Sequence, residues 1–475
     1  MNRTAKNEIS LNAFLSESMA RQGEKPAIRF LQKGREYELT FSELYEKSQA
    51  LAGWMTQNIP PRTAIGILGD NCAEWIMVFF AALFSGNTAV LLDKTARGEA
   101  LTTEAELSGA SVFFIGKEYR GLLDDVACHA DIFLFEDISG YMETEENPVP
   151  EIDDEDPAVV FFSSGTTGRQ KAVMLCRRQL TARFAINRSS WPFPEENLLV
   201  LPLYHAYGMN VASATILQGK CLYLCKSQKY FLRDIKDRKP VMLSLVPSQA
   251  EMLLGCLEKE DETSSLTHIM LASARVDESL KLRMRRHGIT HIAHYGSSES
   301  CMVSVGEERE IVSGFAGRIL EGCEIQLRDS DASGDGEIFI RTPGRFSAYL
   351  KDDEETARVL TGDWIRTGDI GRIDASGRLF ITGRVKNVII LPNGEKVSPE
   401  LLEEKLLGIP GVEESMVYEK NGRLAAELYA GDNERDDIGQ GIRRINEGLS
   451  LYQQIVEVIF RDEPFEKTTL GKKKR

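Results

Sequence analysis

Residues 161–171, Phe-Phe-Ser-Ser-Gly-Thr-Thr-Gly-Arg-Gln-Lys, combine groups that suit the binding of phosphate. Two glycines three apart let the backbone turn its N–H groups inward, four hydroxyls add small donors, and a lysine adds positive charge. These residues are Ser163, Ser164, Gly165, Thr166, Thr167, Gly168 and Lys171. The preceding run Ala158–Phe162 is apolar and predicts a strand. The segment is therefore a candidate polyphosphate loop, although a polar turn has the same composition and the glycine spacing is not that of a Walker A loop.

A carboxylate follows a second predicted strand. Residues 289–294 read as a strand, and Tyr295-Gly296-Ser297-Ser298-Glu299 comes directly after it. This position is the carboxyl end of a strand, where α/β proteins place ligands. A carboxylate is a ligand type that Mg²⁺ takes beside substrate phosphates and water.

Histidines supply two further candidates. His205 follows a buried strand that begins at Leu198. From the residues alone we interpret it as a loop histidine whose ring nitrogens have local hydrogen-bond partners. A metal site at residues 287–294 is rejected, because His291 and His294 lie an odd number of positions apart on one strand and point to opposite faces. No clustered cysteine or carboxylate in the sequence supplies the missing ligands.

Composition limits the class of protein. At 475 residues the chain is too long for one core, so we expect two or three domains, and 42% hydrophobic with 27% charged residues is typical of soluble globular proteins. The longest apolar run, Trp75–Phe84, is too short to cross a bilayer, and the first residues do not resemble a signal peptide, so a cytoplasmic location is predicted. A net charge of −15 argues against nucleic acid or an anionic membrane as the main partner. The eight cysteines contain no C-x-x-C pair and are expected to be free thiols.

The elements that position these residues alternate between strands and helices. Thr40 and Glu43 fit a capping box that opens an amphipathic helix. Strands are predicted at Ala64–Leu68 and Thr88–Leu92, with a buried helix at Ala73–Phe84 between them. This order predicts a parallel sheet covered by helices on both faces.

Taken together, the motifs resemble those of the adenylate-forming superfamily, which includes acyl- and aryl-CoA synthetases, stand-alone adenylation domains of peptide synthetases, and luciferases. The phosphate loop is similar to YTSGTTGxPKG, with Gln170 and Ala172 in place of Pro and Gly. Residues 295–299 are similar to YGxTE, and residues 364–369 to YRTGD. The wording of residues 383–394, GRVKNVIILPNG, is closest to bacterial long-chain acyl-CoA synthetases, although it also fits a hairpin with an Asn-Gly turn. The final nine residues match the closing motif K-T-x-x-G-K-x-x-R, so the resemblance runs from about Leu11 to the end.

The resemblance implies an α/β fold with two parts. A large N-terminal domain, residues 1–383, would consist of parallel sheets layered with helices. A small mobile α+β domain, residues 384–475, would follow a hinge at Lys386. We expect the small domain to carry Lys472, the lysine that reaches the reacting centre.

The resemblance also implies a role for each matching residue. Tyr295, Gly296 and the segment around Ala274 would border adenine, and Ser298 would contact a phosphate. Asp369 and Arg384 would bind ribose, Glu299 would hold Mg²⁺, and His205 would border the acyl pocket. Arg275, where relatives have Pro, is interpreted as a solvated charge, with contact to a polar group of the substrate as the alternative. The catalytic set is then Lys472, Glu299 and His205, and the nucleotide set is Ser163, Ser164, Gly165, Thr166, Thr167, Gly168, Lys171, Ala274, Tyr295, Gly296, Ser298, Asp369 and Arg384.

The implied function is ATP- and Mg²⁺-dependent activation of a carboxylic acid, a fatty or other acyl acid, to an acyl-adenylate, followed by thioester formation with CoA. One alternative is a stand-alone enzyme that loads the acyl group onto the phosphopantetheine of a carrier protein. The other is a non-catalytic nucleotide-binding relative, which the retention of Lys472 disfavours. The sequence specifies neither the acyl chain nor whether the enzyme forms a homodimer.

Overall fold

The computed structural model describes residues 9–32, 34–123, 130–142, 152–164, 170–260, 265–272, 276–331, 334–392, 395–431 and 435–466. The chain divides into two compact units. The first unit comprises Met1–Ser244, Gly296–Met302 and Arg341–Asp363, and the second comprises Leu245–Tyr295, Val303–Ile340 and Trp364–Arg475. Residues 383 and 384 both belong to the second unit, so the domain division predicted between them stays a prediction.

A seven-stranded sheet lies at the centre of the first unit, in the order β18-β8-β7-β4-β3-β5-β6. Its strands are β3 (Ala64–Leu68), β4 (Thr88–Leu91), β5 (Val112–Ile115), β6 (Asp131–Leu134), β7 (Pro157–Ser164), β8 (Gln170–Cys176) and β18 (Ala348–Tyr349). The pairs among β3 to β7 are parallel, whereas β8 is antiparallel to both β7 and β18. Because β3, β4 and β5 are covered on both faces, they read as nearly continuous apolar runs.

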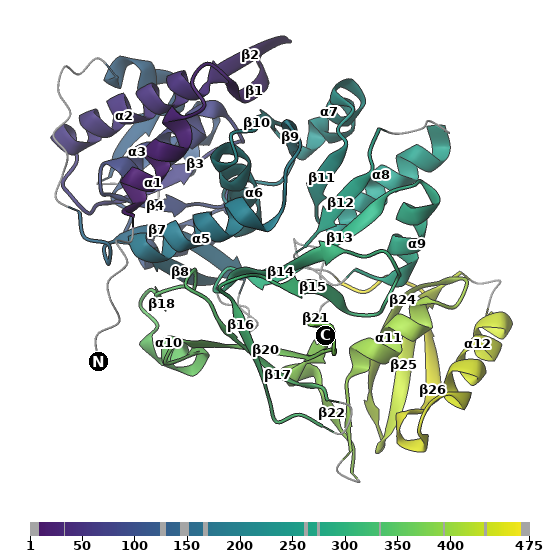
Figure 1. Cartoon of the computed structure of the whole chain (residues 1–475). Coiled ribbons are helices and arrows are strands. Elements are labelled where there is room, and N and C mark those ends of the chain that lie inside the picture. The colour runs from purple at the N-terminus through teal and green to yellow at the C-terminus, as the bar shows by residue number, and fades with distance from the viewer. Residues whose placement is uncertain are drawn as a thin grey trace. The chain divides into compact units, whose positions relative to one another are not determined.

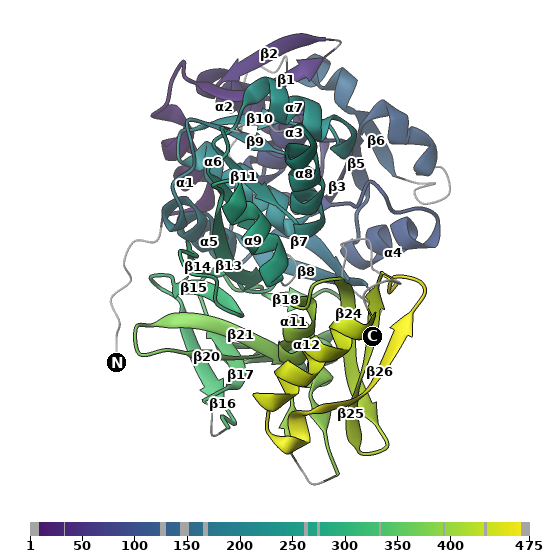
Figure 2. The ribbon, with the colours of Figure 1, turned by 90° about the vertical axis from the view of Figure 1, so that its right-hand side faces the viewer.

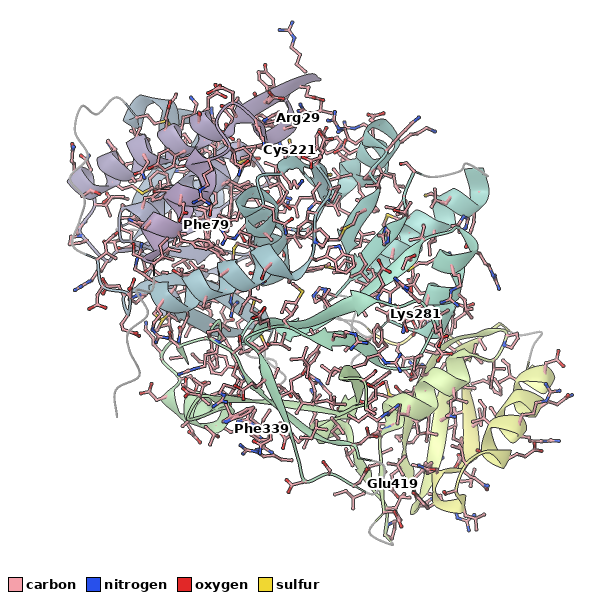
Figure 3. The ribbon with its side chains drawn as sticks, in the orientation of Figure 1. Arg29, Phe79, Cys221, Lys281, Phe339 and Glu419 are labelled. Carbon is pink, nitrogen blue, oxygen red and sulfur yellow. The ribbon has the colours of Figure 1, made fainter. Side chains whose placement is uncertain are left out.

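The first unit contains eight helices within its described residues. They are α1 (Leu11–Ala20), α2 (Phe41–Asn58), α3 (Ala73–Phe84), α4 (Glu99–Ser108), α5 (Arg177–Ser190), α6 (Ala206–Leu217), α7 (Phe231–Arg238) and α10 (Asp353–Val359), with 3₁₀ turns at Lys117–Leu122, Phe135–Tyr141 and Gln228–Tyr230. Of these helices, α3, α4, α5 and α10 contact the seven-stranded sheet. The capping box at Thr40 and Glu43 is confirmed at the start of α2. Figure 1 shows α1, α2 and α3 side by side near β3 and β4, and α3, which carries Phe79 (Figure 3), is buried along almost its whole length.

Five more strands of the first unit pair in the order β2-β1-β10-β9-β11. They are β1 (Pro26–Gln32), β2 (Arg35–Thr40), β9 (Glu196–Leu199), β10 (Cys221–Leu224) and β11 (Met242–Leu245), whose last residue belongs to the second unit. The β1–β2 pair is antiparallel and the others are parallel. Arg29 on β1, labelled in Figure 3, forms an ion pair of 2.8 Å with Glu196 on β9, which links two strands that are not neighbours.

The second unit holds parallel strands and a group of antiparallel strands in the order β16-β17-β20-β21-β15-β14. Its helices α8 (Pro247–Glu260) and α9 (Glu278–Arg286) accompany the parallel strands β12 (His268–Leu271) and β13 (Thr290–Ser297). The antiparallel part comprises β14 (Cys301–Glu307), β15 (Phe315–Ile319), β16 (Glu324–Arg328), β17 (Gly336–Arg341), β20 (Trp364–Ile373) and β21 (Arg378–Arg384), while β19 (Leu360–Thr361) belongs to the first unit. The ends of β13, β14 and β17 extend into first-unit residues.

The C-terminal part of the second unit is an α+β arrangement. It contains a 3₁₀ turn at Val385–Asn387, β22 (Ile389–Ile390), β23 (Lys396–Val397), α11 (Pro399–Leu407), β24 (Val412–Lys420), β25 (Arg423–Ala430), α12 (Arg435–Glu447), a 3₁₀ turn at Leu451–Gln453 and β26 (Ile455–Arg461). The helix α11 packs against β24 and α12 (Figure 2), around a core that includes Leu406, Leu424 and Ile438. Pro399 opens α11 as predicted, because its missing N–H costs nothing in the first helical turn.

Candidate functional site

The hairpin of β7 and β8 positions both ends of the predicted phosphate loop. Ser163 lies directly opposite Lys171, and Ser164 pairs with Gln170, at the end where the two strands meet. Gly165, Thr166, Thr167 and Gly168 lie outside the described residues. The structure therefore places Ser163, Ser164 and Lys171 together at the base of the loop.

Lys171 is held by two neighbours on the segment that follows β17. Its ammonium forms an ion pair with Glu355 on α10 and lies 4.9 Å from the centroid of the Tyr349 ring. Tyr349 is beside Lys171 because β18 pairs with β8 (Figure 1). Hydrogen bonds from Arg358, supported by Lys171, lower the pKa of Glu355 to about 2, so Glu355 is a carboxylate at neutral pH.

Glu299 belongs to the same cluster. The Tyr349 hydroxyl donates a hydrogen bond of 2.8 Å to Glu299 Oε1, and burial together with that carboxylate raises the Tyr349 pKa. One tyrosine thus contacts both the predicted phosphate lysine and the predicted metal ligand. A glycine is needed at position 296, since a Cβ there would lie 2.0 Å from the carbonyl oxygen of Cys301.

Arg183 on α5 supports the backbone beside Glu299. Its buried guanidinium donates hydrogen bonds to the carbonyl oxygens of Ser298 at 3.0 Å and Gly344 at 2.9 Å. Sequence reasoning missed Arg183, Tyr349 and Glu355. For Arg183 a signal existed in the spacing, because it lies three residues after Leu180 and next to Phe184, and all three are buried on one face of α5.

His205 is the residue immediately before α6, where the sequence predicted a loop. Its ring lies 4.4 Å, centroid to centroid, from that of Tyr204. Burial lowers the pKa of His205 while the charge of Asp93 opposes the shift, so the imidazole is neutral at pH 7. A neutral ring suits a pocket wall better than an electrostatic role.

Three predicted nucleotide-binding residues meet in the second unit. Asp369 and Arg384 lie opposite each other on β20 and β21. Asp369 Oδ1 accepts a hydrogen bond of 2.6 Å from Arg384 Nε, and Oδ2 accepts one of 2.7 Å from the Tyr295 hydroxyl. Burial, and then the charge of Asp369, raises the Tyr295 pKa well above its usual value. Tyr295 is the last residue of its segment in the second unit, and Gly296, the next residue of the chain, belongs to the first unit.

The other predicted site residues are less defined. Lys386 is exposed in the 3₁₀ turn after β21, and Ala274, Arg275 and Lys472 lie outside the described residues. His291 is a buried structural group that is hydrogen-bonded to Glu308 at 2.6 Å. The same carboxylate accepts a hydrogen bond of 2.9 Å from Lys281, the residue labelled in Figure 3.

The oxygen ligand at Glu299 fits Mg²⁺, which takes one or two carboxylates with phosphate and water oxygens. Within the part of the chain that the structure describes, no three His, Cys, Asp or Glu residues are grouped so as to hold a metal by themselves. In the same residues, no helix has both the length and the apolar character needed to span a membrane.

Comparisons with known proteins extend over nearly the whole chain. The profile of the family described as "AMP-binding enzyme" matches residues 15–350. An indoleacetate–CoA ligase of Aromatoleum aromaticum is 25% identical over 98% of this chain and 96% of its own length. A putative acyl–CoA ligase of Bacillus subtilis, YdaB, is 28% identical over 93% and 94%. The solved O-succinylbenzoate CoA synthetase of Bacillus subtilis, in complex with AMP, superposes with a TM-score of 0.79 at 22% identity and covers 97% of this chain and 96% of that one.

The structural likeness confirms the predicted α/β fold class, with its large sheet-rich part and its helices. The family profile covers well over half of the residues and includes the phosphate loop and the Glu299 segment. The chain therefore belongs to the AMP-binding enzyme family, the adenylate-forming enzymes that its motifs resemble.

Proposed function

We propose that this enzyme activates a carboxylic acid with ATP and transfers the acyl group to CoA, as an AMP-forming acid–CoA ligase. The cofactors of such an enzyme are ATP, Mg²⁺ and CoA. The observation that carries the proposal is the cluster in which Tyr349 contacts both Lys171 and Glu299. A positive charge and a metal-binding carboxylate beside a glycine- and hydroxyl-rich loop are the parts that a reacting polyphosphate requires.

The chemistry takes place in two steps. A carboxylate oxygen of the acid attacks the α-phosphorus of ATP, pyrophosphate leaves, and the acid becomes an electrophilic acyl-adenylate. The sulfur of CoA then attacks the acyl carbon, loses its proton, and releases AMP. The first step depends on positioning and charge neutralisation, and no covalent nucleophile from the protein is needed.

Each group of the cluster has a part in the first step. Lys171 would offset negative charge on the phosphates, with hydroxyls of the loop and Ser298 as further donors. Glu299 would hold Mg²⁺, which would neutralise charge on the phosphate oxygens. Lys472 is proposed, by resemblance, to reach the reacting centre in this step only.

Asp369 is proposed to accept hydrogen bonds from the ribose hydroxyls, the usual role of an acidic residue in nucleotide sites. Arg384 already binds one carboxylate oxygen and would keep the side chain in place. Tyr295, Gly296 and Ala274 are proposed to border adenine. The movement of a small domain, residues 384–475, about Lys386 between the two steps belongs to the same proposal.

The acid is proposed to be an aromatic or arylalkyl acid rather than a long-chain fatty acid. The sequence of residues 383–394, at the predicted hinge, favoured a fatty acid. Two of the proteins compared above are named for indoleacetate and succinylbenzoate, and both of these acids carry aromatic rings. A neutral His205 next to Tyr204 suits the border of an aromatic pocket. Transfer to a carrier protein remains the second candidate, since the phosphopantetheine arm has the same thiol as CoA.

A product assay tests the proposal. The enzyme with ATP, Mg²⁺ and a panel of aryl, arylalkyl and fatty acids is given either CoA or a phosphopantetheinylated carrier protein, and thioesters and AMP are quantified by mass spectrometry. We expect AMP and acyl-CoA in equal amounts with an aryl acid. AMP formation with carrier protein alone would favour the second candidate, and ATP binding without AMP formation for any acid would indicate a non-catalytic relative.

A further inference from the structure

Lys171 has an anionic partner in the structure. Glu355 Oε1 accepts from its ammonium, and the two side chains are only 13% and 14% exposed. Phosphate oxygens that bind Lys171 must therefore compete with a carboxylate in a partly desolvated place, where like charges repel more strongly than in water.

Arg358 gives Glu355 a second partner. The guanidinium donates to both carboxylate oxygens, from Nε to Oε2 at 2.6 Å and from Nη2 to Oε1 at 2.5 Å. This bidentate pair uses both oxygens in the geometry that guanidinium and carboxylate prefer. Glu355 would thus remain paired if Lys171 turned away.

We propose that Glu355 is a resident counter-ion of Lys171 that ATP displaces: the ammonium passes from the carboxylate to the phosphates, and the charge of Glu355 is left to Arg358. The inference rests on the proposed role of Lys171 in binding ATP, and it adds Glu355 and Arg358 as residues that set the affinity for the nucleotide. No bond is made or broken, and only ionic partners are exchanged.

The position of α10 supports this exchange. The Thr356 hydroxyl accepts from the backbone N–H of Tyr349 at 2.9 Å, and β18 pairs with β8, so the Glu355 side chain starts from an anchored segment beside Lys171. The Tyr349 ring is a neutral neighbour of the ammonium, because its pKa is raised. The pair with Glu355 keeps Lys171 from remaining as an uncompensated, largely desolvated charge.

The two partners of Glu355 predict opposite effects on the binding of Mg·ATP. In Glu355→Gln the phosphates no longer displace a carboxylate, so we expect Kd to fall about tenfold, or about 1.4 kcal/mol. In Arg358→Gln the carboxylate loses its second partner, so Kd rises about three- to tenfold. Calorimetric titration with Mg·ATP, without acid or CoA, measures both changes.

Two controls separate ion exchange from the general field of the protein. Glu354→Gln removes the same charge from the exposed neighbouring position on α10 and should leave Kd unchanged. In the double variant Glu355→Gln/Arg358→Gln, independent charges would cancel and restore the wild-type Kd, whereas the proposal predicts the tighter Kd of Glu355→Gln, because Arg358 acts only through Glu355.

Unchanged or weaker binding in a folded Glu355→Gln variant, or cancellation in the double variant, would overturn the proposal. If Glu355→Gln does not fold, Arg358→Gln decides alone, because the Arg358 side chain is 59% exposed: weaker binding supports the proposal and unchanged binding contradicts it. A wild-type enzyme that binds Mg·ATP but adenylates no acid would contradict only the proposed function. The role of Glu355 is tested by the Kd of Mg·ATP, which does not depend on adenylation.

Discussion

Replacing Arg183 with Met tests whether the buried guanidinium maintains the metal side of the site. The Met side chain fills part of the same space but leaves the carbonyl oxygens of Ser298 and Gly344 without their donor. Each buried carbonyl left without a partner costs about 1–3 kcal/mol. Part of that cost is offset, because Met does not bury a positive charge. Burial of the Arg183 guanidinium is unfavourable, since it lowers the pKa of Arg183. We expect a net loss of about 2–4 kcal/mol in the free energy of unfolding.

Arg177 provides a matched control on the same helix. It is also buried, and it donates to Asn12 Oδ1 at 2.6 Å and to the Leu83 carbonyl at 2.9 Å, rather than to the backbone beside Glu299. Arg177→Met should destabilise the protein by a similar amount. Only Arg183→Met should also raise the Mg²⁺ concentration needed for half-maximal adenylation, by about tenfold. This factor corresponds to a loss of roughly 1.4 kcal/mol in the free energy of Mg²⁺ binding when Glu299 is no longer held in position.

Denaturant unfolding gives the stability changes, and ATP–pyrophosphate exchange titrated with Mg²⁺ gives the metal dependence. An equal rise in the Mg²⁺ requirement in both variants would mean that general destabilisation causes it. An unchanged requirement in Arg183→Met would refute the link between this arginine and Glu299.

Three further outcomes are expected. Glu299→Gln should lower adenylation roughly 10²-fold and raise the Mg²⁺ requirement; recovery on adding ATP at constant Mg²⁺ would contradict a metal role. Lys472→Ala should cut adenylation by orders of magnitude but preserve thioester formation from preformed acyl-adenylate, and equal loss in both steps would refute its assignment to the first. Burial raises the pKa of Glu104 to about 7, so the folded state keeps a proton that the unfolded state loses near pH 4.5, and stability falls as pH rises between these values. Relative to Glu104→Gln, the wild type should lose at most about 3 kcal/mol over this window, measured by denaturant unfolding at each pH, and parallel pH profiles would exclude Glu104 as the cause.

Much of the fold could be predicted from local pattern. The strand Ala64–Leu68 and the helix Ala73–Phe84 have the bounds that their apolar runs predicted, because buried parallel strands and buried helices are apolar throughout. The start of α6 was missed, since Gly208 disfavours a helix. The structure explains that glycine: a Cβ at this position would lie 2.0 Å from the carbonyl oxygen of Pro202.

Residues of the candidate site were predicted only where they belong to a recognisable sequence motif. Lys171, Glu299 and Asp369 were identified from motif wording, and each has a close polar partner in the structure. Glu355 and Tyr349 were not, because their contacts join residues 184 and 50 positions apart, and a single glutamate on a short charged helix gives no periodic signal. Such partners are determined by the pairing of β18 with β8, which requires the three-dimensional fold.

The cluster around Lys171 and Glu299 is proposed to activate a carboxylic acid with ATP. Exchange of labelled pyrophosphate into ATP, measured with and without an aryl or arylalkyl acid and in the absence of CoA, tests this proposal most directly. We predict exchange that requires both the acid and Mg²⁺, and that is lost in Glu299→Gln at the Mg²⁺ concentration that saturates the wild type. Exchange that proceeds equally without any acid, or none with any acid although Mg·ATP binds, would contradict the proposal.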